Sequence, residues 1–543
     1  MLAPIAFLVI FFVYPLLSIL IVSLAPTGQL DLTGFGTLLT SGYYRQTLWF
    51  TLWQAAVSTG LTLALALPGA YVFARFSFPG KSLLLALATL PFLLPTVVVA
   101  AAFSALVGPR GLVNAWLMAS FNLDAPVIQL ERTLAIILIV HVFYNYAIAL
   151  RIISTYWMNV NPRLEESARV LGAYGWRLWW YVRLPILRPA ILAAASLVFV
   201  FTFTSFGVIL ILGGPRFATL EVEIYRQTAH LFNLPMAAAL SLVQMAIMFA
   251  MMTVYTGFQR RLTLERVPAE QALRRPRTRA EYLAVALNLG LMAGLLFAPL
   301  LALIIRSFSA GGEITTLYYQ MLAANPRDSV LFVPPLQAVA NSLVFASLTT
   351  CLAVGLGVLA AYRLVRRLSP WTTWLDSLFM LPLATSAVTL GFGYIIALDK
   401  PPLNLRTSPA LIVAAHTLVA LPFVLRSLLP SLRSIAPSIQ ESARVLGASP
   451  WQVWRLIDLP LISRSLMVGA VFAFTVSMGE FGASLFIARP DTPTMPVVIY
   501  RLLGQPGPAN YGQALAMSTL LLVVAGAAFL VIERLRTANG GEF

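Results

Sequence analysis

The segment ESARVLGA occurs twice in this chain, at Glu166–Ala173 and again at Glu441–Ala448. The copies lie 275 positions apart, and each contains a turn-forming glycine, Gly172 or Gly447, that is followed at the same distance by a Leu-Pro pair. An identity of this length with a matching flank indicates an internal duplication. The chain must therefore fold into two related halves, each carrying this polar segment.

The composition places both halves in a membrane. The chain is 59% hydrophobic and only 10% charged, with a mean hydropathy of +0.85, whereas soluble domains are about 25% charged. Apolar runs near the 20 residues that cross a bilayer recur throughout. We predict an all-α polytopic membrane protein with 12 transmembrane helices, at 2–25, 46–74, 82–107, 133–155, 189–212 and 237–257, then 282–305, 339–362, 374–397, 408–430, 465–488 and 513–533.

The cysteine content and the first apolar run argue against other kinds of protein. The single cysteine, Cys351, excludes a disulfide framework and a multi-thiolate metal site, and core packing is its expected role. The first apolar run, from Leu2, is too long for a signal-peptide core and lacks a basic flank, so we expect a retained first helix. No metal-ligand set is evident.

The basic residues predict the orientation. If the N-terminus is cytoplasmic, most of the 36 Lys and Arg fall on the inner side, as the positive-inside rule requires. Six spans per half then give two parallel six-helix repeats, 1–258 and 282–543, joined by an arginine-rich cytoplasmic linker, 259–281. Both termini are expected in the cytoplasm, and the linker charge favours lipid headgroups over nucleic acid.

The duplication extends well beyond the octapeptide. His141 matches His416 at the same offset, and Phe206-Gly207 matches Phe481-Gly482. Upstream the offset becomes 291, which indicates an insertion of 16 residues in an outer loop of the first half, near 108–132. Loops tolerate insertions better than spans do.

The repeated segment predicts a short helix, a turn and a second short helix. Pro162 and Pro437 suit a first helical turn, and Gly172 and Gly447 suit a helix end. Tryptophans follow at helical spacing, so a membrane-surface helix with aromatic anchors is one interpretation. That interpretation explains one copy, but it does not explain two near-identical copies in a chain whose spans have diverged.

The pattern E-[SA]-A-x3-G-x9-[IV]-x-L-P resembles the cytoplasmic loop of permease subunits in bacterial ABC importers that work with a solute-binding protein. The resemblance covers essentially the whole chain. It implies the type I ABC importer permease fold, a prokaryotic inner-membrane location, an extracytoplasmic solute-binding protein and two copies of a cytoplasmic ABC ATPase. The implied ATPase-coupling residues are Glu166, Ser167, Ala168, Gly172, Leu184 and Pro185 in the first half, and Glu441, Ser442, Ala443, Gly447, Leu459 and Pro460 in the second.

The sequence contains no enzyme site of its own. A phosphate-binding loop needs a glycine five positions before its Gly-Lys-Ser, and Arg75 stands there ahead of Gly80-Lys81-Ser82. We therefore expect a permease subunit without ATPase activity and without a cofactor.

Candidate pathway residues lie in the fifth and eleventh spans. Glu480 is an acid inside an apolar run, where a functional role is the default hypothesis; hydrogen bonding between helices is the structural alternative. Its repeat partner is Ser205, so the acid is asymmetric, and Phe206 and Phe481 follow the two positions. His141 and His416 are expected to be packing residues with satisfied hydrogen bonds.

The resemblance is closest to fused thiamine and ferric-iron permeases, and the segments Leu212–Pro215 and Ala218–Glu221 favour the thiamine type. A cationic aromatic solute would suit Glu480 and nearby aromatic rings. The alternatives are a secondary transporter driven by an ion gradient through Glu480, and a membrane scaffold or channel. Neither alternative needs two matched docking loops.

Overall fold

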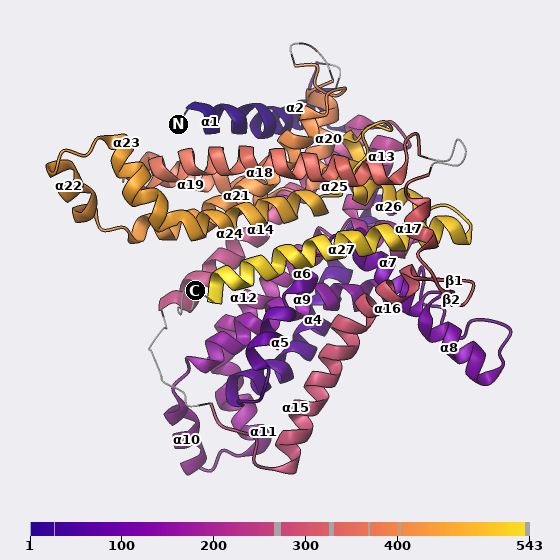
Figure 1. Ribbon diagram of the computed structural model, residues 1–543, viewed down its shortest axis with the longest axis vertical. Helices are drawn as coiled ribbons and strands as arrows, with labels where there is room; N and C mark the ends of the chain where they lie inside the picture. The colour runs from indigo at the N-terminus through magenta and orange to yellow at the C-terminus, as the bar shows by residue number, and fades with distance from the viewer. Residues whose placement is uncertain are drawn as a thin grey trace.

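The structure is a computed structural model that describes residues 2–26, 28–214, 216–264, 273–324, 331–366, 370–399, 401 and 403–537. Part of the expected linker, 265–272, lies outside the described residues. The described chain is helical apart from one two-stranded hairpin (Figure 1). In that hairpin β1 pairs antiparallel with β2, with Ser309 opposite Ile314.

The helices of the first half, including π-helical turns marked η, are α1 Leu2–Leu8, η1 Val9–Val13, α2 Tyr14–Leu24, α3 Thr33–Thr40, α4 Gly42–Arg75, α5 Lys81–Leu87, α6 Leu90–Leu93, α7 Thr96–Val107, α8 Leu112–Phe121, α9 Leu134–Met158, α10 Pro162–Val170, α11 Gly175–Leu178, η2 Trp179–Arg183, α12 Leu184–Phe203, η3 Ile209–Gly213, α13 Leu220–Ala229 and α14 Leu234–Leu264.

The elements of the second half, in which η5 is a 3-10 turn, are α15 Arg279–Met292, η4 Ala293–Phe297, α16 Ala298–Ser307, β1 Ser309–Ala310, β2 Glu313–Ile314, α17 Leu317–Met321, α18 Pro335–Arg366, α19 Pro370–Met380, η5 Leu381–Ala384, α20 Ala387–Ala397, α21 Ala410–Ser434, α22 Pro437–Val445, α23 Pro450–Val453, η6 Trp454–Asp458, α24 Leu459–Gly479, α25 Gly482–Ile487, α26 Met495–Leu503 and α27 Pro508–Thr537.

Eleven helices of the described chain are long and apolar enough to span a membrane, and one bent pair makes a twelfth. This confirms the polytopic all-α class. The predicted third span, 82–107, is wrong as a continuous helix, because the chain breaks at Leu94-Pro95 and the spanning candidate is Thr96–Phe121. Proline lacks an N–H and disfavours a helical residue before it. The matching span in the second half breaks between Leu383 and Ala387, with a bend of 97°.

Each half has the same three-helix centre. In the first half α4, α9 and α12 pack together, and in the second half the repeat-related α18, α21 and α24 do the same. Cys351 on α18 is exposed, so the expectation that it packs in the core is wrong. In a membrane-spanning helix an outward apolar face can contact lipid, and hydropathy alone does not separate that face from the core.

The first span of each half contacts the other half as well as its own. Helix α2 packs on α14 and on α20, and α16 packs on α27 and on α7. Asn288 on α15 donates to the hydroxyl of Tyr146 on α9 at 3.0 Å, close to Gly69, where a Cβ would lie 2.6 Å from that hydroxyl oxygen. The sequence halves are therefore interlocked in space.

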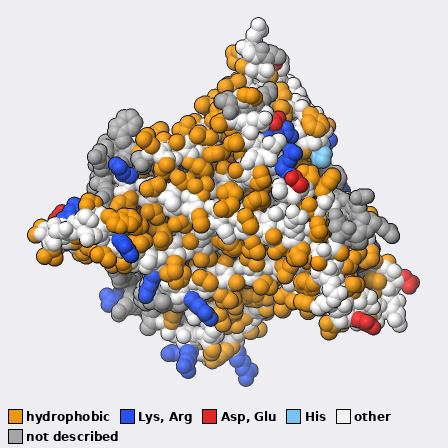
Figure 2. All heavy atoms as spheres, turned by 45° about the horizontal axis from the view of Figure 1, so that its top comes forward, with side chains coloured by type: hydrophobic (Ala, Val, Ile, Leu, Met, Phe, Trp, Pro, Cys, Tyr) orange, Lys and Arg blue, Asp and Glu red, His pale blue; other side chains and the backbone are white. Residues whose placement is uncertain are grey.

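The two ends of the molecule differ in what they carry. The loops α10–α11 and α22–α23 lie on the left of Figure 1, together with the start of α1 and the end of α27. Helix α8, which lies in the segment 108–132 expected as an insertion, and the β-hairpin lie on the right. Figure 2 shows hydrophobic side chains over most of one face, with Lys and Arg gathered at its left and lower edges.

Candidate functional site: two repeated loops and a cavity between the halves

The two ESARVLGA segments have the same local structure. Each starts in a helix that begins with a proline, Pro162 or Pro437, and contains a glycine with a left-handed backbone, φ 85° at Gly172 and 86° at Gly447. The residue after each glycine closes the turn, with Ala173 N donating to Ala168 O at 2.9 Å and Ala448 N to Ala443 O at 3.0 Å. This is a glycine-dependent helix end, in which a residue with a Cβ would be strained.

Exposure also repeats between the copies. In both, the Glu, Ser and Gly expected at the coupling site are exposed and the first Ala is half-buried. The tip of each loop presents a leucine to solvent, 88% exposed at Leu171 and 87% at Leu446. The Leu-Pro pairs begin the following spans, α12 and α24. Two matched apolar tips, exposed at the same end, form candidate docking surfaces.

The support beneath the two loops differs in charge. Arg75 and Arg183 both form ion pairs with Glu165, and the Arg183 Nη2 to Glu165 Oε2 distance is 3.1 Å. At the repeat-related positions Gln440 Nε2 donates to Asp458 Oδ1 at 2.7 Å. Burial alone would raise the pKa of the Glu165 carboxyl, but the hydrogen bonds and charges of Arg183 and Arg75 outweigh it and hold the pKa below its usual value.

Arg183→Asp alone is expected to lower the free energy of unfolding by about 3 kcal/mol, because it replaces a cation beside the buried Glu165 with a second carboxylate. Adding Glu165→Gln recreates the pair found under the second loop and is expected to restore most of that loss. SDS titration in detergent micelles measures both variants.

The control for this prediction is Arg169→Ala. Arg169 lies 3.9 Å from Glu165 and is half exposed, so its loss is expected to change stability by less than about 1 kcal/mol. Equal destabilisation by Arg183→Asp and by the double variant would contradict the equivalence of the two supports.

A cavity of about 410 Å³ lies where the halves meet, and both candidate pathway positions border it. Helix α12 ends just before Ser205 and Phe206, and α24 ends at Gly479, just before Glu480 and Phe481. The eleventh span is thus interrupted at Glu480, which was expected inside a continuous helix. The rings of Phe206 and Phe481 stack across the interface between the halves, with centroids 5.7 Å apart.

The paired histidines are held by serine hydroxyls, as expected for packing residues. Both ring nitrogens of each are engaged: His141 with Ser58 at 2.9 Å and Ser205 at 2.8 Å, and His416 with Ser477 at 2.7 Å and Ser484 at 2.8 Å. The fold thus ties each histidine to the break in the neighbouring span.

Glu480 is hydrogen-bonded on both oxygens. Oε1 accepts from Ala483 N at 2.8 Å, and Oε2 accepts from Ser484 N at 2.9 Å and Ser484 Oγ at 2.6 Å. His416 Nε2 lies 3.3 Å from Oε2. Glu480 therefore satisfies the N-terminus of α25, where N–H groups have no partner within the helix.

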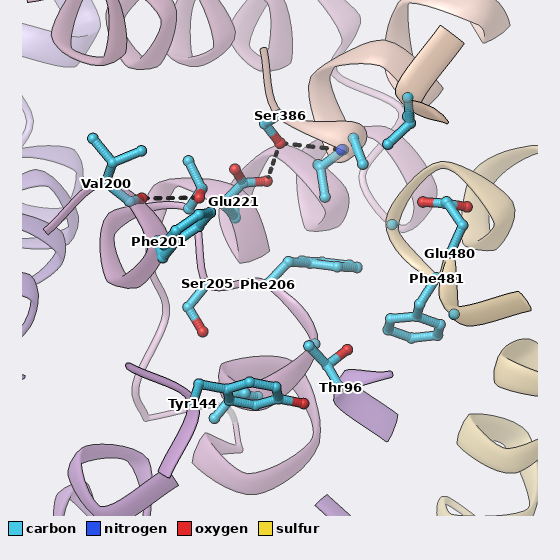
Figure 3. A pocket seen from close by; sticks show the side chains of 18 of the residues that line it. Thr96, Tyr144, Val200, Phe201, Ser205, Phe206, Glu221, Ser386, Glu480 and Phe481 are labelled. Atoms are coloured by element: carbon cyan, nitrogen blue, oxygen red, sulfur yellow. Dashed lines mark hydrogen bonds between the residues drawn. The ribbon is translucent and has the colours of Figure 1, made fainter. Parts of the chain in front are cut away.

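A second carboxylate in the cavity, Glu221 on α13, was not predicted as a pathway residue from the sequence. Its Oε2 accepts from Ser386 Oγ of the other half at 2.7 Å, and its Oε1 accepts from Gln244 Nε2 at 2.5 Å. Figure 3 shows Glu221 beside Ser386, apart from Glu480. The signal available in the sequence was an acid with no counterpart, since Pro496 stands at the repeat-related position.

The repeated loops, the interlocked halves and the central cavity define a two-repeat membrane permease. The chain belongs to the family described as "Binding-protein-dependent transport system inner membrane component", which matches residues 57–264 and 353–537. It is the multi-pass inner-membrane permease component of a binding-protein-dependent ABC importer, and such a component lacks ATPase activity. The expected family, fold class and non-enzymatic role are thereby confirmed.

Several relatives are similar to this chain over most of its length. The thiamine transport system permease protein ThiP of Salmonella typhimurium is 26% identical over 522 residues, covering 94% of this chain and 92% of the relative. ThiP of Escherichia coli is 27% identical over 510 residues, covering 90% and 89%. The probable ABC transporter permease protein y4fN of Sinorhizobium fredii is 26% identical over 559 residues, covering 98% and 95%.

Solved structures share less of the chain. A crystal structure of a bacterial ABC transporter that imports alginate matches with 19% identity and a TM-score of 0.40, covering 48% of this chain and 92% of the matched one.

Proposed function

We propose that two copies of a cytoplasmic ABC ATPase dock on the loops α10–α11 and α22–α23 and drive the cavity between outward-facing and inward-facing states. The observation that carries this proposal is the repeated loop, with the same φ angle at Gly172 and Gly447 and equal exposure of Leu171 and Leu446. The residues that we propose for coupling are the ones predicted from the sequence. Membership of the family decides against the gradient-driven alternative.

We also propose the orientation. The loop end of the molecule, with both termini, faces the cytoplasm, and the opposite end, with α8, meets the solute-binding protein. We also propose the division into domains that the sequence predicts: two repeats, 1–258 and 282–543, joined by a basic linker, 259–281. Arginine at the loop end supports the orientation, because cytoplasmic loops carry an excess of Lys and Arg.

For the substrate we propose thiamine. The ThiP relatives support this choice, as do the rings of Phe92, Phe201 and Tyr144 beside two carboxylates in the cavity. Thiamine is an aromatic cation, and aromatic faces and carboxylates both attract cations. Ferric iron is the second candidate, and it is less favoured because no group of three His, Cys, Asp or Glu suited to a metal occurs among the described residues.

Thiamine uptake tests the substrate. Proteoliposomes holding this permease with its ATPase, supplied with its thiamine-loaded binding protein, are expected to accumulate thiamine only when ATP is present. Accumulation of ferric iron with no thiamine uptake would overturn the substrate proposal.

A charge reversal in both loops tests the docking. Glu166→Lys combined with Glu441→Lys is expected to abolish co-purification of the ATPase, because both glutamates are exposed on the proposed docking helices. Intact ATP-dependent uptake by the double variant would sink the docking proposal.

A further inference from the structure

Two carboxylates border the cavity, and their surroundings differ. Glu480 accepts three hydrogen bonds, two of them from the backbone at the start of α25, and lies beside His416. Glu221 accepts two hydrogen bonds, both from neutral side chains. Within the described chain it forms no ion pair with Lys, Arg or His, although its side chain is fully buried. A carboxylate has room for about four acceptor contacts, so Glu221 keeps capacity that Glu480 has used.

Burying a carboxylate without a counter-charge is costly, and such groups inside membranes mark ion or substrate pathways. Glu480 accepts hydrogen bonds from backbone N–H groups at the start of α25, whereas Glu221 accepts hydrogen bonds only from side chains. Its bond to Ser386 joins the first half to the second at the start of α20, where Ser386 also accepts from Val388 N at 3.1 Å. A relative movement of the halves would separate Glu221 from Ser386 and free one of its oxygens.

An independent feature of the cavity points to a ligand that donates hydrogen bonds. Asn145 lines the cavity and is 2% exposed. Its Nδ2 donates to His141 O at 2.8 Å, whereas its Oδ1 has no hydrogen-bond partner in the described chain. Buried polar atoms are normally satisfied. No Lys or Arg of the described chain lines the cavity, so the free polar capacity is that of an acceptor.

We propose that Glu221 is the group that meets the positive charge of an organic cation in the cavity, with Asn145 Oδ1 as an accompanying acceptor, while Glu480 has a structural role. The proposal rests on the proposed function and names thiamine, through its thiazolium ring, as the cation. The stacked rings of Phe206 and Phe481 lie in the same cavity (Figure 3). Aromatic faces add attraction for a cation that has left water.

The test uses the complete transporter in proteoliposomes, with the binding protein saturated by thiamine. Glu221→Gln is expected to lower the thiamine moved per ATP hydrolysed by about tenfold, which corresponds to the loss of a single favourable charge contact. Hydrolysis stimulated by the binding protein is expected to persist, because the docking loops are untouched. A variant that was merely damaged in its fold would lose hydrolysis and transport together.

A matched control lies two residues away. Glu223 is also a fully buried glutamate on α13, but it bonds Tyr43 and Gln227 and does not line the cavity. Glu223→Gln is expected to leave the thiamine transported per ATP unchanged. If Glu221→Gln proves unstable, Ser386→Ala is the second variant: it frees Glu221 without removing its charge and is expected to retain thiamine transport.

A neutral analogue separates charge recognition from shape. With 3-deazathiamine, in which a thiophene replaces the thiazolium, Glu221→Gln and the unmodified protein are expected to transport equally once the binding protein is loaded. Equal thiamine transport by both proteins, or an equal loss for thiamine and the analogue, would overturn the role of Glu221 and leave the proposed function standing. Absence of thiamine transport by the unmodified protein would overturn the substrate and this inference together.

Discussion

Leu171→Asp combined with Leu446→Asp is expected to reduce ATPase capture and ATP-driven uptake by at least about tenfold. Each change removes from the docking surface an apolar side chain whose burial stabilises the complex by about 1.5–3 kcal/mol. Both leucines protrude from the tips of the repeated loops and have little contact with the rest of the chain. An aspartate at these exposed positions changes the free energy of unfolding of the permease little, whereas burying its charge at an interface has a large unfavourable free energy. The effect is therefore expected on docking and not on folding.

The measurement is co-purification of the ATPase with the permease, followed by uptake in proteoliposomes. Each single variant keeps one intact loop and is expected to retain part of the capture. The control is Phe121→Asp, which alters another exposed apolar residue, 64% exposed, on α8 at the opposite end of the molecule. Phe121→Asp should leave ATPase capture unchanged, and loss of capture in that control would show that the assay reports general damage.

The repeated loops were predictable because their structure is local. Pro162 and Pro437 at helix starts, and Gly172 and Gly447 at left-handed helix ends, follow from backbone sterics within a few residues. Exposure of the loop tips also follows, because a polar segment between two spans has no apolar core to enter. The break in the third span of the first half was missed because hydropathy counts apolar residues and does not register Pro95. The matching break in the second half was missed because hydropathy does not register Ser386, whose hydroxyl accepts from Val388 N at the start of α20.

The cavity was predictable only in part. Glu480 drew attention as an acid within an apolar run, and Ser205 was found through the repeat. Glu221 escaped because its neighbour in space, Ser386, is distant in sequence, and α13 is too polar to be counted as a span. Its place in the cavity depends on how the halves pack against each other, and contacts between the halves produce no repeating pattern in a single sequence.

The two histidines show how the repeat and the packing combine. Ser205 bonds His141, and its repeat partner Glu480 lies beside His416. In both halves the histidine contacts a polar group at the break in the neighbouring span. That group is the hydroxyl of Ser205 in the first half and the carboxylate of Glu480 in the second. Asymmetry at that position is compatible with a structural role in each half.

Glu480→Leu is expected to be the most destabilising single change at the cavity. It would leave Ala483 N, Ser484 N and the Ser484 hydroxyl without their acceptor, and each unsatisfied buried donor costs about 1–3 kcal/mol. Glu480→Gln keeps one acceptor oxygen, so it is expected to lose less. SDS titration of the purified permease measures the order, with Leu well below Gln and Gln below the unmodified protein.

Transport by Glu480→Gln separates a structural role from a cation-binding one. If Glu480 serves mainly to hold the start of α25, thiamine moved per ATP by the folded fraction should remain within about threefold of the unmodified protein, a difference below about 1 kcal/mol. The repeat-related control Ser205→Ala removes one hydrogen bond to His141 and should cost about 1 kcal/mol of stability. A fully stable Glu480→Gln that moves no thiamine would instead assign the cation to Glu480, because a structural cap that is dispensable for folding has no other reason to stop transport.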